Sequence, residues 1–280
     1  MRKIKASAPG KLMLFGEHAV IYNRPCLVAA IDKWVTVTTI EKKGEESVFV
    51  KTARQLFEQK FGKVGVGFMI DGFDSCFGLG SSAAVTVATA KALFKLKNIK
   101  VSKEELFDFC YQVVKKVQGV GSGFDLAAAI YGGVVYFMTG GEKIERLAVQ
   151  ELPLVVGYSG EKADTVKMIK KAAKKINQQF LRQSVKIVNQ ARAVIKRENW
   201  QEVGRLMNQN QEIIRKLGVS TPKLEKLIQV SLKAGALGAK LSGAGGGDCM
   251  IALVVEGKRM VVEKAIEQAG GEIIRVKLSL

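Results

Sequence analysis

The stretch Gly78-Leu79-Gly80-Ser81-Ser82-Ala83-Ala84 limits what this chain can fold into more than any other. Two glycines and two hydroxyls stand directly before an apolar, alanine-rich segment that predicts a helix out to about Asn98. The first turn of a helix carries unpaired backbone N–H groups and the positive end of the helix dipole. Glycines let the oxygens of a ligand approach that backbone, because no Cβ stands in the way. The stretch therefore predicts a phosphate-binding loop at the entrance to a helix.

An ordinary helix cap and two other nucleotide-binding motifs are alternatives for this stretch. A Gly-Ser turn that only caps a helix stays open, because serine is a common N-cap residue. A dinucleotide-binding fingerprint fits Gly78, Gly80 and Ala83, but residues 84–103 lack the acidic residue that this motif needs. A Walker A loop needs Gly-Lys followed by Ser or Thr. None of the Gly-Lys pairs in this sequence is followed by either residue, so a Walker A loop is excluded.

The composition predicts a folded globular protein. The chain has 280 residues, 48% of them hydrophobic and 25% charged, which is enough for one large core or two smaller ones. No apolar run approaches the roughly 18 residues that cross a membrane, and the basic N-terminus lacks the apolar segment of a secretory signal. We therefore expect a cytoplasmic protein with no membrane partner.

The net charge of +18 calls for an anionic partner. Charge alone leaves nucleic acid, a membrane surface and phosphorylated metabolites open. Nucleic-acid binding is disfavoured, because the sequence has no recognised helix-turn-helix, zinc-finger or RNA-binding signature. A zinc site and a disulfide framework are disfavoured too, because the four cysteines form no C-x-x-C pair and His18 is the only histidine. We expect reduced thiols packed in the interior.

Short strands dominate the predicted N-terminal part. Polar and apolar residues alternate over residues 4–15 around Ala8-Pro9-Gly10, which predicts two strands joined by a turn, with Lys11 after it. Further strands are predicted at 34–40, 47–50 and 66–70, with a helix at 52–61. Gly16-Glu17-His18-Ala19-Val20 places an acidic residue beside the only imidazole. A lone histidine is most often structural, so these residues by themselves assign it no chemistry.

A second glycine-rich stretch, Gly119 to Asp125, enters a short helix predicted at 126–131. Ser122 is the predicted N-cap, and Asp125 stands where a carboxylate suits the helix dipole. A strand follows at 134–137. Upstream, Ser102 and Glu105 predict a capping box that opens another helix.

The character of the chain changes near residue 150, where we place a domain boundary. Four helices are predicted after it, at 163–177, 181–197, 200–217 and 222–233. The first has a predicted apolar stripe, and the lysines between its members should face solvent; the stripe is Val166, Ile169, Ala173 and Ile176. A third glycine-rich stretch, Lys240 to Cys249, leads to elements predicted as a strand at 250–255, a helix at 258–269 and a last strand at 272–280.

Three stretches of the chain, in this order, resemble the motifs of the GHMP kinase superfamily, which includes galactokinases, homoserine kinases, mevalonate kinases and phosphomevalonate kinases. They are Ala8 to Leu12 with Gly16 to Val20, then Gly78 to Ala84, then Lys240 to Cys249. The resemblance implies an α+β fold of two domains. Residues 1–150 would resemble ribosomal protein S5 domain 2, and residues 151–280 would be ferredoxin-like, with ATP and an acceptor between them.

Within the superfamily, two subfamilies share the resemblance. Gly16 to Val20, followed by Tyr22 and Arg24-Pro25, looks most like mevalonate kinases, as does Met207 to Gln211 leading into Leu217 to Ser220. Val120 to Ala129 and the ending Asp248-Cys249 are similar to phosphomevalonate kinases. The resemblance thus implies phosphorylation of the C5 hydroxyl of mevalonate by ATP in isoprenoid synthesis, with 5-phosphomevalonate as the alternative acceptor.

The resemblance also implies roles for single residues. Those that would hold the phosphates of ATP are Gly78, Leu79, Gly80, Ser81, Ser82 and Ala83, supported by Gly243, Ala244, Gly245, Gly246 and Gly247. Ser82, or else Ser81, would give its hydroxyl to Mg²⁺. Lys11 and Asp125 match the catalytic pair, in which a lysine keeps the carboxylate ionised. Glu17, His18 and Thr165 match positions near the acceptor.

The chain departs from the mevalonate kinase pattern at two positions. Val114 stands where these kinases often carry a Mg²⁺-binding glutamate, so the metal would rest on Ser82, phosphates and water. Ala163 stands where they commonly have an arginine, which bears on how the substrate is held. A homodimer is one assembly that the resemblance allows, although the sequence does not determine the oligomeric state.

Overall fold

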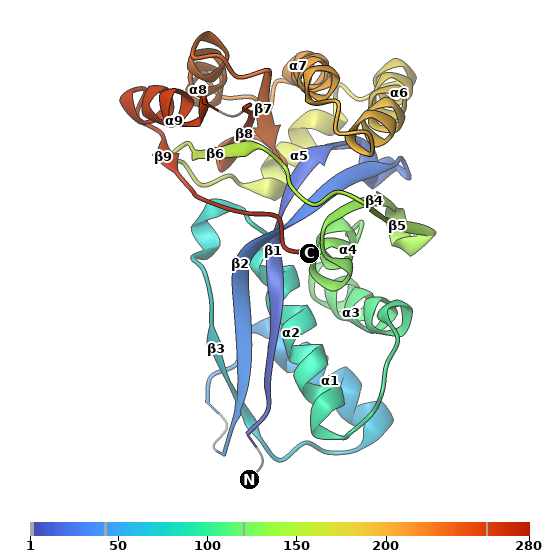
Figure 1. The fold of residues 1–280 in the computed structure, drawn as a ribbon. Helices are drawn as coiled ribbons and strands as arrows, with labels where there is room; N and C mark the ends of the chain where they lie inside the picture. The colour runs from blue at the N-terminus through green and yellow to red at the C-terminus, as the bar shows by residue number, and fades with distance from the viewer. Residues whose placement is uncertain (1–2, 42–43, 120, 256) are drawn as a thin grey trace.

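Two lobes share one long pair of strands in the computed structural model, which describes residues 3–41, 44–119, 121–255 and 257–280 (Figure 1). A five-stranded antiparallel sheet forms the frame of the N-terminal lobe. Its members are β1 (Lys5–Phe15), β2 (Cys26–Ile40), β3 (Gly67–Asp71), β4 (Val134–Met138) and β5 (Lys143–Leu147). Strand β2 pairs with β1 along one edge and with β3 and β4 along the other, and β5 extends the sheet beyond β4.

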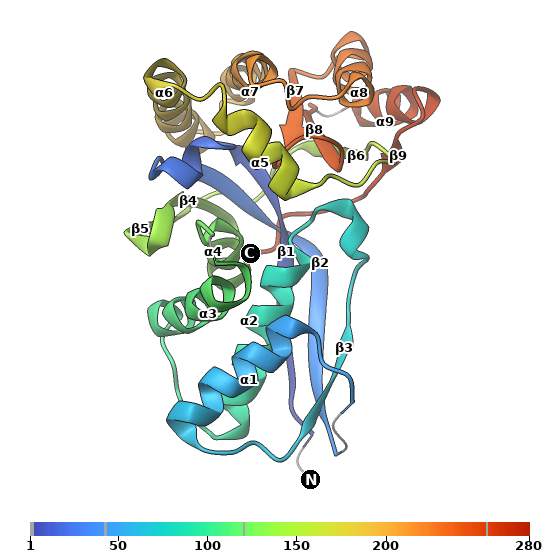
Figure 2. The ribbon, with the colours of Figure 1, turned by 180° about the vertical axis from the view of Figure 1, so that it is seen from behind.

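Four helices lie together on one side of this sheet (Figure 2). They are α1 (Val48–Phe61), α2 (Ser81–Leu96), α3 (Lys103–Gln118) and α4 (Phe124–Tyr131). Alanine, valine and threonine fill α2, and nearly all of its residues from Ala83 on are buried, so it lies between the strands and the other helices. Short 3₁₀ turns complete the lobe at η1 (Ala19–Tyr22), η2 (Ser75–Phe77) and η3 (Thr139–Gly141).

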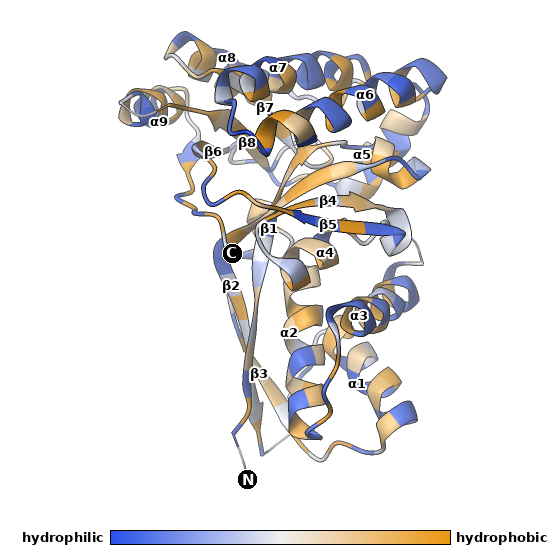
Figure 3. Ribbon diagram, turned by 45° about the vertical axis from the view of Figure 1, so that its right-hand side comes forward, coloured by the Kyte–Doolittle hydropathy of each residue, from blue (hydrophilic) through white to orange (hydrophobic). Residues whose placement is uncertain are grey.

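The C-terminal lobe packs helices on a second antiparallel sheet with strand order β7-β8-β6-β9. The strands are β6 (Leu154–Tyr158), β7 (Gly238–Ser242), β8 (Cys249–Leu253) and β9 (Glu272–Ile273). The helices are α5 (Thr165–Ala173), α6 (Gln178–Ile195), α7 (Trp200–Lys216), α8 (Pro222–Lys233) and α9 (Arg259–Gln268). Buried residues recur at helical spacing in α6 and α7, while hydrophilic residues cover their outer faces (Figure 3).

One hydrophobic core cluster runs across both lobes, and another lies within the N-terminal lobe between the sheet and its helices. Leu12 and Phe15 of β1 and Leu27 of β2 belong to the same buried cluster as the apolar residues of β6, α6 and α7. The ends of β1 and β2 that reach the C-terminal lobe are therefore packed into it. Among the described residues, no helix is both long and apolar enough to cross a membrane.

The structure confirms the α+β class and many of the predicted elements. The helix predicted at 222–233 has these same bounds, and the capping box at Ser102 and Glu105 is present. Cys26, Cys110 and Cys249 are free and buried, as expected, while free Cys76 is only half-buried. Val120, part of the second glycine-rich stretch, lies outside the described residues.

Several predicted boundaries in the N-terminal lobe are wrong. The two strands predicted at 4–15 are the single strand Lys5–Phe15, because among the described strands β1 pairs with β2 alone and an edge strand tolerates the missing N–H of Pro9. The strand predicted at 47–50 is the start of helix α1, whose N-cap is Ser47. The N-cap of α4 is Gly123 instead of Ser122. Strand β5 and the first half of β2 were not predicted from the sequence.

Two predictions in the C-terminal lobe are also wrong. Helix α5 is shorter than predicted and buries Ala172, whereas Val166 of the predicted stripe is 62% exposed. The last strand stops at Ile273, because the chain then leaves this sheet and reaches β2, where Leu278 forms a single bridge with Ile31. Strand β6 was not predicted either.

Candidate active site

The first glycine loop, residues 78–83, turns sharply into helix α2. Gly78 and Gly80 have φ values of +69° and +81°, which favour glycine. Gly80 is the N-cap, so the two serines lie inside the first turn, and no side chain of the described residues caps this helix end. The alternative of an ordinary serine cap is therefore wrong, and the backbone N–H groups of the first turn are left for a ligand.

Lys11 of β1 is held against this loop by its backbone and its side chain. Its backbone N–H donates to the carbonyl oxygen of Leu79 at 2.8 Å, and its Nζ donates to the carbonyl oxygen of Gly78 at 3.0 Å. A Cβ on Gly80 would lie only 2.8 Å from Cγ of Lys11, so this close approach requires glycine. The lysine thus lies beside the predicted phosphate position.

Asp125 meets Lys11 from the first turn of α4. Nζ of Lys11 lies 3.7 Å from Oδ1 of Asp125. This oxygen is buried and has no hydrogen-bond partner among the described residues, although 37% of the side chain is exposed. Burial raises the pKa of the Asp125 carboxyl, and Lys11 partly offsets the rise. The pair therefore offers a free carboxylate acceptor next to a cation.

The second glycine loop, residues 243–247, reaches the first through Asp248. Oδ1 of Asp248 accepts a hydrogen bond from the backbone N–H of Ala163 at 3.0 Å. A Cβ on Gly78 would collide with the carboxylate of Asp248, so the two loops are in close contact. Gly246 is equally crowded, because a Cβ there would lie 2.6 Å from Cγ of Met168 in α5. The structure thus brings both predicted phosphate-binding stretches together.

Glu17 is completely buried in an ion pair. Its carboxylate accepts from Nζ of Lys240 in β7 and from Nδ2 of Asn210 in α7, the latter at 3.0 Å. Both charged side chains are 0% exposed, so neither presents a face to a ligand. The structure therefore corrects the expectation that Glu17 contacts an acceptor: its oxygens bind the C-terminal lobe. Lys240 and Asn210 belong to stretches that carry the family resemblance, but the sequence analysis assigned neither of them a role.

His18 follows Glu17 and is held at the second glycine loop. Its Nε2 lies 3.0 Å from the carbonyl oxygen of Ala244, and the residue has φ +61°. Burial lowers the pKa of the imidazole, and the neighbouring Glu17 partly offsets this shift. Thr165 is exposed at the start of α5, one turn before Met168, which lies against Gly246. His18 therefore contacts the second glycine loop, and Thr165 lies on the helix whose Met168 packs against that loop.

The described residues contain no group of three or more His, Cys, Asp or Glu side chains that could hold a metal ion. Ser82 exposes its hydroxyl in the first turn of α2, while Val114 is buried in the core of the N-terminal lobe. Mg²⁺ commonly keeps several waters and binds phosphate oxygens with only one or two protein ligands. The hydroxyl of Ser82 fits such a site next to a phosphate.

Comparison with known proteins links this geometry to an enzyme family. The model of the GHMP kinases N terminal domain matches residues 48–133, and that of the GHMP kinases C terminal domain matches residues 191–272. A Pyrococcus furiosus protein named mevalonate kinase is 35% identical over 99% of this chain and 96% of its own length. The crystal structure of L. major mevalonate kinase in complex with R-mevalonate is 28% identical with a TM-score of 0.84, covering 98% of this chain and 95% of that one. Streptococcus pneumoniae phosphomevalonate kinase has a TM-score of 0.89 over 100% of both chains, and at 23% identity this shows a shared fold alone.

Proposed function

Because this chain belongs to the GHMP kinase family, we propose that it transfers the γ-phosphoryl group of ATP to the C5 hydroxyl of mevalonate. The observation that carries the proposal is the Lys11–Asp125 pair, which lies 3.7 Å apart beside the first glycine loop. Relatives that are 35% identical over almost the whole chain are named mevalonate kinases, and this supports the acceptor. The two-domain α+β fold predicted from the resemblance is confirmed for the chain as a whole.

In this proposal, Asp125 accepts the hydrogen bond of the acceptor hydroxyl and orients its oxygen. The Asp125 side chain is 37% exposed, and its Oδ1 has no hydrogen-bond partner among the described residues, so the carboxylate can accept this bond. The ammonium group of Lys11 offsets negative charge on the transferring phosphoryl group. Phosphoryl transfer through a loose transition state depends mainly on such positioning and charge stabilisation.

The two glycine loops would hold the nucleotide. Backbone N–H groups of residues 78–83 would bind the phosphates at the positive end of α2, and residues 243–247 would support them from the other lobe. We propose Ser82 as the protein ligand of Mg²⁺, which would neutralise phosphate charge when bound. His18 and Thr165 would contact the acceptor, and buried Glu17 would fix the position of His18.

A coupled assay of ADP release tests the acceptor. Mevalonate and 5-phosphomevalonate should be offered in parallel to the same enzyme with ATP and Mg²⁺. We expect kcat/KM for mevalonate to be higher by on the order of 100-fold, because one extra phosphate needs cationic partners of its own. The second candidate, phosphomevalonate kinase, is favoured by Asp248-Cys249, and the reverse preference would establish it.

Gly80→Ala should impair catalysis through Lys11. The new Cβ would lie 2.8 Å from Cγ of Lys11, so the lysine must move away from the loop. We expect kcat to fall by about 100-fold, the effect of a small misplacement of a reacting group. Steady-state kinetics with ATP and mevalonate would measure the fall.

Gly62→Ala is the matched control for this substitution. Gly62 shares the positive φ, +82° against +81° for Gly80, while ψ differs at 165° against 32°, and a Cβ on Gly62 would meet no atom of the described residues within 4 Å. Gly80→Ala should lose about 1 kcal/mol of stability from its left-handed backbone, and Gly62→Ala should lose more, because its ψ lies in a region that only glycine adopts readily. Only Gly80→Ala should lose turnover. Equal kcat values for the two variants would contradict the proposed contact.

A further inference from the structure

The chain crosses from one lobe to the other after strand β9. The backbone N–H of Ile274 still donates to Val156 of β6, at 3.0 Å, and the chain then runs down to β1 and β2 (Figures 1 and 2). We call residues 276–280 the C-terminal strap. Its end lies in the N-terminal lobe although its sequence neighbours belong to the C-terminal lobe.

Backbone hydrogen bonds attach the C-terminal strap to β2. Ser279 N–H donates to the carbonyl oxygen of Ala30 at 2.9 Å, and Asp32 N–H donates to that of Lys277 at 3.0 Å. The side chain of Asp32 joins in, because its Oδ1 accepts from Lys277 N–H at 2.8 Å. Gly133, just before β4, donates to the carbonyl oxygen of Ser279 at 2.6 Å. The strap therefore continues the line of β4 along the edge of β2.

The attachment lies where β2 bulges opposite the step from Pro9 to Gly10, directly before Lys11. In the β1–β2 ladder Lys11 pairs with Ala30, but Pro9 pairs with Trp34, so Asp32 and its neighbour have no partner on β1. A bulge bends its strand and re-aims the side chains around it. Both polar groups that the strap binds at Asp32, the N–H and the carboxylate, hold this bulge in place.

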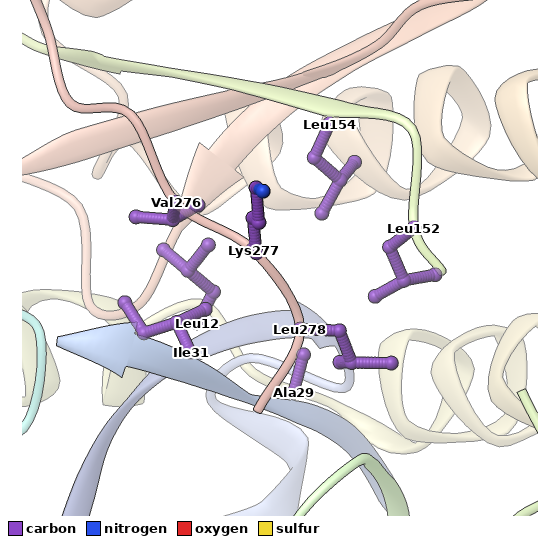
Figure 4. Close-up of a pocket in the computed structure, with 8 residues that line it drawn as sticks. All are labelled: Leu12, Ala29, Ile31, Leu152, Leu154, Val276, Lys277 and Leu278. Carbon is purple, nitrogen blue, oxygen red and sulfur yellow. The ribbon is translucent and has the colours of Figure 1, made fainter. Parts of the chain in front are cut away.

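Apolar contacts hold the C-terminal strap from the other side. Val276 and Leu278 face a small cavity that Leu12 of β1 and Ile31 of β2 also line (Figure 4). The cavity measures only about 10 Å³, so the strap packs closely over the residue that follows Lys11. A shift of the strap would therefore change the packing of Leu12 in β1.

We propose that the C-terminal strap is a positioning element for Lys11, acting through Asp32 and the bulge in β2. Because Lys11 pairs with Ala30 in the β1–β2 ladder, a shift of the bulge in β2 moves the backbone of Lys11. The hydrogen bond from Lys11 N–H to Leu79 couples that backbone to the first glycine loop. Two residues before the strap, Ile274 bonds to Val156 of β6, so the strap also links the bulge in β2 to the C-terminal sheet. The kinetic part of the test rests on the proposed function.

Asp32→Ala tests the proposal, with Asp32→Asn as the matched control. Asp32 is exposed, and an asparagine Oδ1 can accept the same bond from Lys277, so both variants should fold. Asp32→Ala should lower kcat about 10-fold with KM for ATP nearly unchanged, and Asp32→Asn should keep the wild-type kcat. In Asp32→Ala alone, Lys11 should also move away from Asp125. Because Lys11 lowers the pKa of that carboxyl, the fall of kcat on acidification (the acid limb of the pH profile) should then begin at a higher pH.

Hydrogen–deuterium exchange gives a second readout that needs no activity. Ser279→Pro removes the N–H that donates to Ala30, whereas Ser279→Ala keeps it. The amide of Lys11 should exchange at least about 10-fold faster in Ser279→Pro, and at the wild-type rate in Ser279→Ala. If the wild-type protein fails to phosphorylate mevalonate, the proposed function is wrong. The exchange rate of the Lys11 amide still tests whether the strap positions Lys11. Unchanged exchange at Lys11 in Ser279→Pro, or an unchanged acid limb in Asp32→Ala, would overturn the inference.

Discussion

Asp125→Asn should lower kcat by about 1,000-fold while the affinity for ATP stays close to that of the wild type. The amide keeps the shape of the carboxylate but cannot take up a proton or carry the charge that pairs with Lys11 at 3.7 Å. ATP affinity should persist, because the first glycine loop binds phosphates through its backbone. Steady-state kinetics and calorimetric titration with a nonhydrolysable ATP analogue would measure the two quantities.

The pH dependence of this variant provides a second check. Burial raises the pKa of Asp125, and Lys11 of β1 opposes the rise. The thiol of Cys26 in β2 is another titratable group nearby, and its pKa is raised by burial and, to a smaller extent, by the charges of Glu17 and Asp125. Wild-type kcat should therefore fall on acidification at a pH above the ordinary range of an aspartate. Because the folded carboxyl holds its proton more tightly than the unfolded one, its ionisation costs stability as pH rises through this window. Asp125→Asn should remove that cost and melt at the same or a higher temperature at neutral pH.

Asp71→Asn is a suitable control for the charge change, because Asp71 is exposed in β3 at the outer edge of the sheet. It should keep both kcat and melting temperature. A nearly normal turnover in Asp125→Asn would remove this residue from the catalytic pair and leave Lys11 to act alone.

Lys240→Met should destabilise the protein by about 3 to 5 kcal/mol. The substitution leaves the carboxylate of Glu17 buried without its cation, and Glu17 and Lys240 are both 0% exposed. Asn210 would still donate to the carboxylate, but one neutral donor does not replace an ion pair. Urea unfolding followed by fluorescence or circular dichroism would measure the loss.

The double variant Lys240→Met with Glu17→Gln separates loss of the ion pair from loss of packing. Neutralising Glu17 removes the unpaired charge, so the double variant should recover a large part of the lost stability. Lys264→Met changes an exposed lysine of α9 and should alter stability by no more than about 0.5 kcal/mol. A double variant that is less stable than Lys240→Met alone would show that the pair does not behave as a buried ion pair.

Local features of the active site could be predicted from residue types. The glycines at 78 and 80 are required by backbone conformation, and a helix after them follows from the alanine-rich, apolar sequence. The same holds for the long helices, since the 3.6-residue spacing of apolar side chains decides which face is buried. The pairing of Lys11 with Asp125 came from the resemblance to the kinase motifs, and the structure places the two side chains together.

Apart from those that the family resemblance implied, contacts between distant parts of the chain were beyond prediction. The resemblance implied a ligand contact for Glu17, but Lys240 and Asn210, which are 223 and 193 residues further along the chain, bind its carboxylate. The role of Asp32 depends on Lys277, which is 245 residues further along the chain. No periodicity or turn signal carries information over such separations, because these signals describe only a residue and its near neighbours.

The sequence by itself determined most of the helical segments, which loops need glycine and which family of enzymes the chain resembles, because each depends on a short run of residues. Only the tertiary structure decided that the strand carrying Lys11 is continuous, that Glu17 joins the two lobes, and that the end of the chain returns to the first lobe. These outcomes depend on which buried charges and open strand edges find partners when the two lobes pack together.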